Sequence, residues 1–148
     1  MNTQKSNEAR RLVVESLVLK VLNGCGLKSS PVSNVPWELH MQPLREWNMY
    51  KPVRVRIKYQ LNSKFFSVDR DSVKNTPAVL WAEVFSDSIW VARTSDLRNF
   101  VNAITPIKCI EVCEYYNKEE IMTMFHRIDK MKIVEVRNKI KQLCSVRY

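Results

Sequence analysis

Acidic side chains near expected strands could support metal-dependent chemistry in this chain. Asp69 and Asp71 follow one run of strand-forming residues, and Glu83 lies within the next such run. Acids of this kind, held beside positive charge, can bind Mg²⁺ against a phosphodiester. Asp69 and Asp71 are equally typical of polar turns, where their side chains bond to nearby backbone groups. The sequence therefore leaves a metal-dependent nuclease subunit as one hypothesis, without fixing the geometry that catalysis needs.

Basic side chains form a clearer pattern in residues 51–59, where apolar and cationic residues alternate. The apolar positions are Val53, Val55, Ile57 and Tyr59, and the cationic ones are Arg54, Arg56 and Lys58. This alternation predicts a half-buried strand with a cationic outer face. Proteins that bind single strands place cations along the phosphates and stack aromatic rings on the bases. The three cations are therefore candidate nucleic-acid contacts, and the alternative is a face that is simply solvated.

A second basic surface is expected on the C-terminal helix, which carries Arg137, Lys139 and Lys141. The whole chain has 24 lysines and arginines against 15 acidic residues, a formal net charge of +9. Such an excess favours RNA, DNA, an anionic membrane surface or an acidic protein as partner, and many basic proteins bind only other proteins. No apolar run approaches the roughly 20 residues needed to span a bilayer, so no membrane partner is expected.

Metal ligands and catalytic nucleophiles are sparse. Cys109 and Cys113 have a spacing seen in zinc ligand pairs, but a closed zinc site needs a second pair. On a strand the two thiols would lie about 13 Å apart, which is too far for one ion. The remaining candidate ligands are isolated: Cys25, Cys144, His40 and His126. No serine or cysteine lies in a recognised nucleophile motif, and His126 fits the surface of the expected C-terminal helix, so we predict no cofactor and no catalytic residue.

Residues 28–52 contain four prolines and are predicted to form a long ordered loop. The segment is too rich in aromatic residues for a plain linker. Trp37 and Trp47 are its candidate anchors for a protein partner. The alternative is that the segment packs across the core as a strap.

These patterns fit one α+β domain. The expected elements, in order, are an N-terminal helix (8–23), the proline-rich loop (28–52), a sheet (53–116) with a polar loop at 69–76 and a short helix at 96–104, and a C-terminal helical region (118–144). Gly24 and Gly26 suit the end of the first helix, because glycine tolerates positive φ. The expected architecture is a bent antiparallel sheet or a small OB-like or Tudor-like barrel, with the N-terminal and C-terminal helices packed on it.

The best-defined local unit is a hairpin around Ser86-Asp87-Ser88, followed by a helix that Ser95 or Asp96 caps. The segment Ala82–Arg93, continuing into Leu97–Val101, resembles the opening of an extended Tudor module. The resemblance implies a barrel-like scaffold that binds protein partners, often methylated arginine tails, in RNA-silencing assemblies. The residues after the helix are expected to be mostly helical, so no cage residues are assigned.

These observations favour a non-enzymatic interaction module, a small basic subunit or adaptor of a ribonucleoprotein or nucleic-acid-processing complex. The amphipathic segments 8–22 and 118–143 are its expected protein-binding surfaces, and the alternative for each is packing on the sheet of its own domain. Direct RNA or DNA binding is the first alternative function, and a nuclease subunit is the second. No small-molecule substrate is evident. The few cysteines and the lack of a signal-peptide pattern favour an intracellular protein, nuclear or cytoplasmic.

Overall fold

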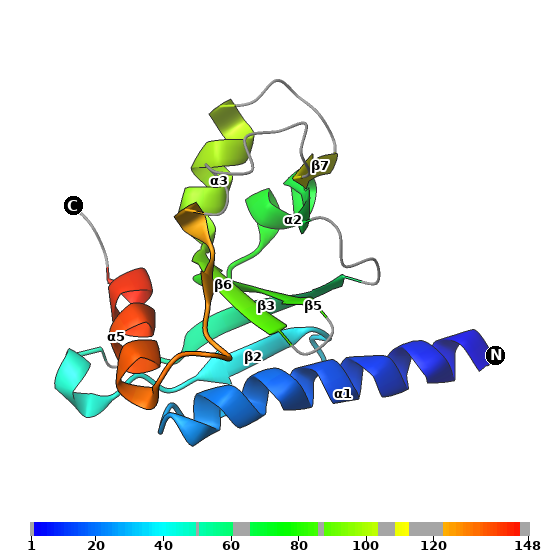
Figure 1. Ribbon diagram of the computed structural model, residues 1–148. Coiled ribbons are helices and arrows are strands. Elements are labelled where there is room, and N and C mark those ends of the chain that lie inside the picture. Colours follow the sequence, from blue (N-terminus) through cyan, green and yellow to red (C-terminus); the bar gives the residue numbers. More distant parts are fainter. Residues whose placement is uncertain are drawn as a thin grey trace.

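The computed structural model of the protein describes residues 2–49, 51–60, 66–85, 88–103, 109–112 and 123–145. The elements follow one another as α1 (Asn2–Gly24), β1 (Ser29–Pro31), β2 (Glu38–Met41), the 3₁₀ helix η1 (Arg45–Trp47), β3 (Val53–Gln60), β4 (Phe66–Asp69), α2 (Arg70–Asn75), β5 (Leu80–Phe85), β6 (Ser88–Arg93), α3 (Thr94–Ala103), β7 (Cys109–Val112), β8 (His126–Arg127) and α5 (Ile133–Cys144). Figure 1 shows β2, β3, β5 and β6 at the centre of the molecule, with α1 below them, α5 to the left, and α2, α3 and β7 above.

The main sheet has the strand order β1-β2-β3-β5-β6-β8, and β4 pairs with β7 in a second, two-stranded sheet. All neighbours in the main sheet are antiparallel except β3 and β5. This pair is parallel because the chain leaves the sheet through β4 and α2 before it returns as β5. The expected α+β class with terminal helices packed on a sheet is confirmed. The sheet is mixed and open, rather than wholly antiparallel or closed into a barrel.

Helices cover both faces of the main sheet. α1 and α5 pack on one face, which forms the main core; the helical residues in it are Val14, Val18, Leu22, Val136, Ile140 and Leu143. α2 and α3 lie on the opposite face, where Val73, Leu97 and Val101 form a second core around Trp81 (Figure 1). Across the described ranges, no helix has both the length and the apolar character that crossing a bilayer requires.

Several local patterns form the elements that they predict. Val55 and Ile57 of β3 are buried in the main core, while its basic residues lie half-buried on the other face. β5 and β6 pair from Leu80, opposite Arg93, to Phe85, opposite Ser88, as the hairpin pattern predicts. α3 then begins at once, so strand, strand and helix form one continuous unit.

The segment 28–52 is the first correction, because it is not a loop throughout. It supplies β1, β2 and η1, so the sheet begins well before residue 53. Leu39 and Met41 of β2 are fully buried against β3. Pro36 and Pro43 lie outside β2 and do not interrupt its ladder. A strand of four residues is too short for its alternation to stand out among prolines.

Two further expectations are wrong. The expected polar loop at 69–76 contains α2, a short helix that the buried Val73 anchors in the second core. In the C-terminal region, Thr123 and Met124 are helical and α5 forms within the expected helical segment, but His126 lies on β8, paired with Val91, rather than on a helix surface. Phe125 packs in the second core and Ile128 in the main core. Their side chains therefore point to opposite faces, as a strand allows and a single helix face does not.

Candidate functional site

A hollow of about 390 Å³ lies where β2 and β3 part. The pairing of β2 with β3 reaches Glu38, opposite Arg56. Just before β2, the Trp37 carbonyl accepts a hydrogen bond from the Ile57 N–H at 2.8 Å. β3 continues to Gln60, and within the described residues this last part of the strand pairs with β5 alone. The fork therefore leaves one edge of β3 beside the hollow.

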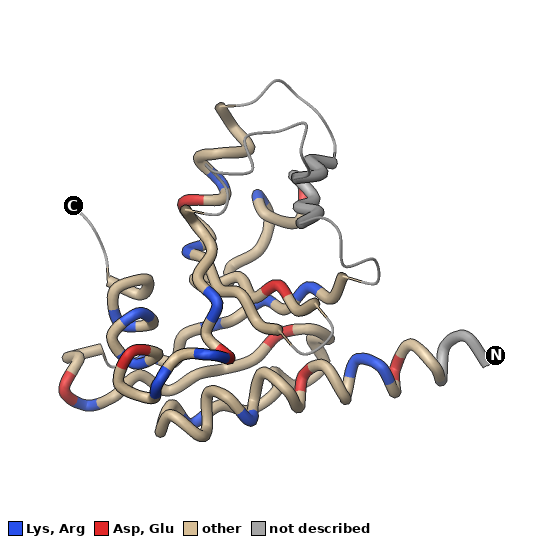
Figure 2. The backbone as a smooth tube through the Cα atoms, in the orientation of Figure 1, with Lys and Arg blue, Asp and Glu red and all other residues tan. Residues whose placement is uncertain are grey.

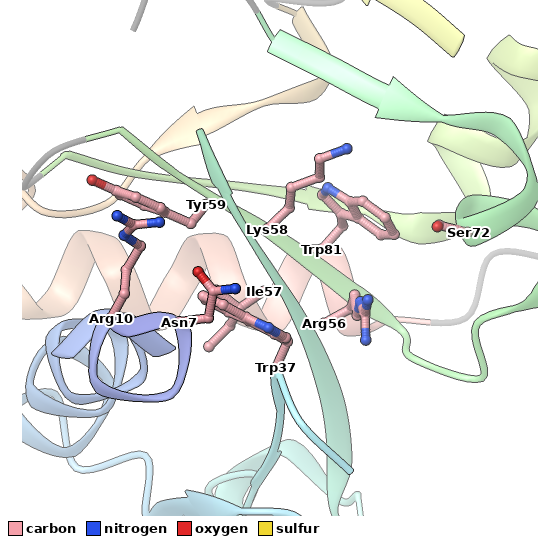
Figure 3. Close-up of a pocket in the computed structure, with 9 residues that line it drawn as sticks. All are labelled: Asn7, Arg10, Trp37, Arg56, Ile57, Lys58, Tyr59, Ser72 and Trp81. Carbon is pink, nitrogen blue, oxygen red and sulfur yellow. The ribbon is translucent and has the colours of Figure 1, made fainter. Parts of the chain in front are cut away.

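Five parts of the chain line this hollow (Figure 3). They contribute Asn7 and Arg10 from α1, Trp37 from the turn before β2, Arg56, Ile57, Lys58 and Tyr59 from β3, Ser72 from α2 and Trp81 from β5. Figure 3 shows Arg10 beside the Tyr59 side chain, and Lys58 beside the Trp81 indole on the other side of the β3 ribbon. The hollow thus follows the free edge of β3 and reaches both faces of the sheet.

Positive charge dominates the hollow. Arg10 is exposed, and Arg56 and Lys58 are half-buried. Among the described residues that line the hollow none is acidic, and none of its three cations forms an ion pair with a carboxylate. Arg56 donates a long hydrogen bond, 3.4 Å, to the Pro36 carbonyl. The charge of the three cations is therefore available to an anion that enters from solvent.

Trp37 is firmly held at the fork. Its φ of 65° lies in the left-handed region, which is rare for a bulky residue. Its N–H donates to Glu15 Oε2 at 3.0 Å, and its carbonyl accepts the bond from Ile57. Glu15 is buried on α1 and also accepts a hydrogen bond from Arg11 Nη1 at 3.3 Å. Costly backbone conformations persist where several contacts fix them, and such positions cluster at ligand sites.

A buried carboxylate fixes the wall of the hollow that Trp81 forms. The Trp81 Nε1–H and the Gln60 side-chain amide each donate a hydrogen bond of 2.7 Å to Glu83. Glu83 is fully buried, and this loss of solvent raises its pKa to about 7, against the opposing effects of the two hydrogen bonds and of Lys58. Lys58 lies directly opposite Glu83 in the β3–β5 pair. Glu83 therefore orients the indole and places a titratable group next to a cation of the hollow.

Only some of the residues predicted as binding contacts line the hollow. Arg56 and Lys58 line the hollow together with Trp37. Arg54 instead forms an ion pair with Glu38 of β2 and does not line the hollow. Trp47, the other predicted anchor, lies half-buried on η1 against the main core.

The predicted basic surface on α5 is not part of the hollow. Arg137 Nε donates to the Cys25 carbonyl at 2.6 Å, which ties α5 to the C-terminal end of α1. Lys139 donates to Gln142 at 3.2 Å, and Lys141 is exposed. Arg10 comes from the N-terminal half of α1, so the hollow and the α5 surface lie toward different ends of that helix. Figure 2 shows Lys and Arg on both helices.

The acids behind the nuclease hypothesis do not form a ligand set in the described part of the chain. Asp71 is exposed on α2, whereas Glu83 is buried between β3 and the helices. Asp69 is the last residue of β4. No three or more His, Cys, Asp or Glu side chains of the described residues come together in a way that could hold a metal ion. Cys113 of the weak zinc pattern lies outside those residues.

Sequence reasoning missed most of the walls of the hollow, namely Asn7, Arg10, Tyr59, Ser72 and Trp81. These residues lie far apart in the chain, and only the packing of α1 and α2 on opposite faces of the sheet brings them together. One local signal was present. Glu15 and Glu83 each interrupt an apolar run, and a carboxylate in such a place indicates a buried acid that needs hydrogen-bond donors.

Comparisons of the chain with protein-family models, with curated proteins and with solved structures found no match. The resemblance of the segment Ala82–Arg93 to an extended Tudor module therefore stays a prediction. That segment forms most of the β5–β6 hairpin.

Proposed function

We propose that this protein is a non-enzymatic nucleic-acid-binding module whose contact site is the hollow at the β2–β3 fork. The observation that carries the proposal is the grouping of Arg10, Arg56 and Lys58 around the half-buried Trp37, with no acidic residue among the described lining. Cations bind phosphates, and aromatic faces suit bases. The formal net charge of +9 adds a long-range attraction for a polyanion.

The shape of the hollow supports a chain-like ligand over a small enclosed anion. It follows the edge of β3 and carries positive charge on both sides of the strand (Figure 3). A strand of nucleic acid presents phosphates at regular intervals and can contact cations on both sides at once. Binding of this kind depends strongly on salt, because each neutralised phosphate releases counterions.

The test is fluorescence anisotropy with labelled RNA and DNA oligonucleotides at about 50 mM and about 200 mM salt. Removing two charges from the hollow with Arg56→Gln/Lys58→Gln is expected to weaken binding at least about tenfold. It should also reduce the slope of log affinity against log salt by about 1 to 2, one unit for each lost phosphate contact.

Lys139→Gln/Lys141→Gln is the matched control, since it removes the same charge from the α5 surface. We expect its affinity to stay within about twofold of the wild type, because these lysines do not line the hollow. Equal losses in the two double variants would contradict the proposal and point to binding through overall charge. Circular dichroism confirms that each variant is folded.

Exposed apolar pairs on two helices favour a second function, that of a protein adaptor in a ribonucleoprotein complex. Leu12 and Val13 on α1 are 53% and 62% exposed, and Ile133 and Val134 on α5 are 51% and 65% exposed. Apolar residues on a helix surface can enter a groove of a partner protein. Leu12→Glu/Val13→Glu should then release a co-purifying protein without weakening oligonucleotide binding. An unchanged set of co-purifying proteins would contradict the adaptor function.

A further inference from the structure

The aromatic walls of the hollow allow a narrower inference, which rests on the proposed function. We propose that the hollow binds single-stranded nucleic acid by taking one unpaired base against Trp37, while Arg10 and the pair Arg56 and Lys58 contact the neighbouring phosphates. The partner is thus a single strand or an unpaired stretch rather than a duplex. The inference depends on the contacts that hold Trp37 in place, on the positions of the three cations and on the size of the hollow.

Trp37 is built as a fixed platform. It lines the hollow and also packs against the main core, so its indole is supported from behind. The hydrogen bonds to Glu15 and from Ile57 fix its backbone on both sides, in a conformation with φ of 65°. A ring that is already immobile loses little conformational freedom when a base stacks on it.

The cations flank this platform instead of forming one cluster. Arg10 comes from α1 and lies beside Tyr59, while Lys58 lies beside Trp81 on the other side of β3 (Figure 3). A nucleotide whose base enters the hollow has one phosphate before it and one after it. Positive charge on both sides of Trp37 suits that pair of phosphates.

The size and the stacking requirement exclude an intact duplex from this mode of binding. A hollow of about 390 Å³ lies within the range that holds small ligands, so it can take a base and not a base pair with its neighbours. In a duplex both faces of each base are already stacked. Only an unpaired base can offer a face to an aromatic side chain.

The experiment compares three ligands with the same number of phosphates on the unchanged protein. They are a single-stranded DNA, the same sugar-phosphate strand made wholly of abasic nucleotides, and a duplex with half as many base pairs as the single strand has nucleotides. We expect the single strand to bind at least about tenfold more tightly than either of the others, which is the usual loss for one stacked base. Equal binding of the abasic strand, or of the duplex, would overturn the inference. This comparison does not depend on the folding of a variant.

Variants of Trp37 then locate the stacking. Trp37→Ala is expected to weaken binding of the single strand about tenfold and to leave the abasic strand unaffected, while Trp37→Phe keeps most of the affinity. If Trp37→Ala binds the single strand as the wild type does, the inference fails. The proposed function would still stand in that case, provided that Arg56→Gln/Lys58→Gln loses binding. If Trp37→Ala and Arg56→Gln/Lys58→Gln both bind as the wild type does, the hollow is not the binding site. Selective binding of an acidic peptide would replace nucleic acid with a protein ligand.

Discussion

At the scale of a single residue, Glu83 links folding to pH. Burial raises its pKa from 4.5 to about 7 in the folded protein. The unfolded chain therefore releases this proton at a lower pH than the folded protein does. The free energy of unfolding should fall as the pH rises from about 4.5 to about 7, by an amount on the order of 3 kcal/mol, and the fall is complete once Glu83 is ionised in both states.

Glu83→Gln tests this link. The amide can still accept the hydrogen bond of the Trp81 indole but does not ionise. The free energy of unfolding of the variant should therefore not fall between about pH 4.5 and about pH 7, and the variant should be more stable than the wild type above pH 7. The measurement is urea unfolding at several values from about pH 5 to about pH 8. Glu135→Gln, at an exposed position of α5, is the control and should keep the wild-type profile. A Glu83→Gln profile that still falls as steeply would show that another group causes the dependence.

Single residues of the site were predictable only where the sequence pattern of their own strand set them apart. Arg56 and Lys58 stood out because β3 alternates over most of its length. The same pattern also selected Arg54, whose charge Glu38 neutralises, because an ion pair with a residue sixteen positions away has no local signature. Arg10 looked like an ordinary exposed arginine of a helix. Its place beside the hollow depends on how α1 packs, which no local pattern encodes.

At the scale of an element, the end of α1 depends on Gly26. This glycine has φ of 80°, and a Cβ added to it would lie 2.7 Å from Arg137 Nη2. Gly26→Ala is expected to lower the free energy of unfolding by about 2 kcal/mol, from the left-handed backbone alone. The guanidinium of Arg137 would also have to move, which weakens its bond to the Cys25 carbonyl.

Gly24→Ala is the matched control, because nothing lies within 4 Å of a Cβ added there. Alanine is favoured over glycine within a helix, so this variant should be as stable as the wild type or slightly more stable. Chemical unfolding of the two variants gives the comparison. Equal stability of Gly26→Ala and Gly24→Ala would mean that the helix end adapts without cost.

Elements were predictable when they carried their own periodicity. α1, β3, the β5–β6 hairpin and α3 are each long enough for a pattern to repeat. β2, α2 and β8 have two to six residues each, and they form because they pair with or pack against neighbouring elements. β8 shows this best, since its two residues are a strand only through their pairing with Trp90 and Val91. Tertiary contacts decide such short segments, and a sequence window does not contain them.

At the scale of the whole molecule, the two cores share one sheet and should unfold together. Leu97 of α3 and Ile140 of α5 are both fully buried, on opposite faces of that sheet. Leu97→Ala and Ile140→Ala are each expected to lower the free energy of unfolding by about 2–5 kcal/mol. Trp37 and Trp47 border the main core, Trp81 belongs to the second core and Trp90 borders it, so tryptophan fluorescence reports on both faces.

The measurement follows unfolding of both variants and the wild type by fluorescence and by far-ultraviolet circular dichroism. One shared midpoint for the two signals is expected in each protein, as in a two-state transition. Separate midpoints, or a variant that shifts one signal alone, would contradict a single cooperative unfolding of the two cores.

The contact of Arg137 with the Cys25 carbonyl joins residues 112 positions apart, and the same helix supplies Ile140 and Leu143 to the main core. During synthesis, therefore, a nascent chain that already contains α1 and most of the sheet still lacks one wall of that core. Contacts of such high sequence separation slow folding, and until α5 has left the ribosome the apolar side of α1 is incompletely covered. In this period the uncovered apolar side of α1 is exposed to aggregation, and the packing of α5 then supplies the missing wall of the main core.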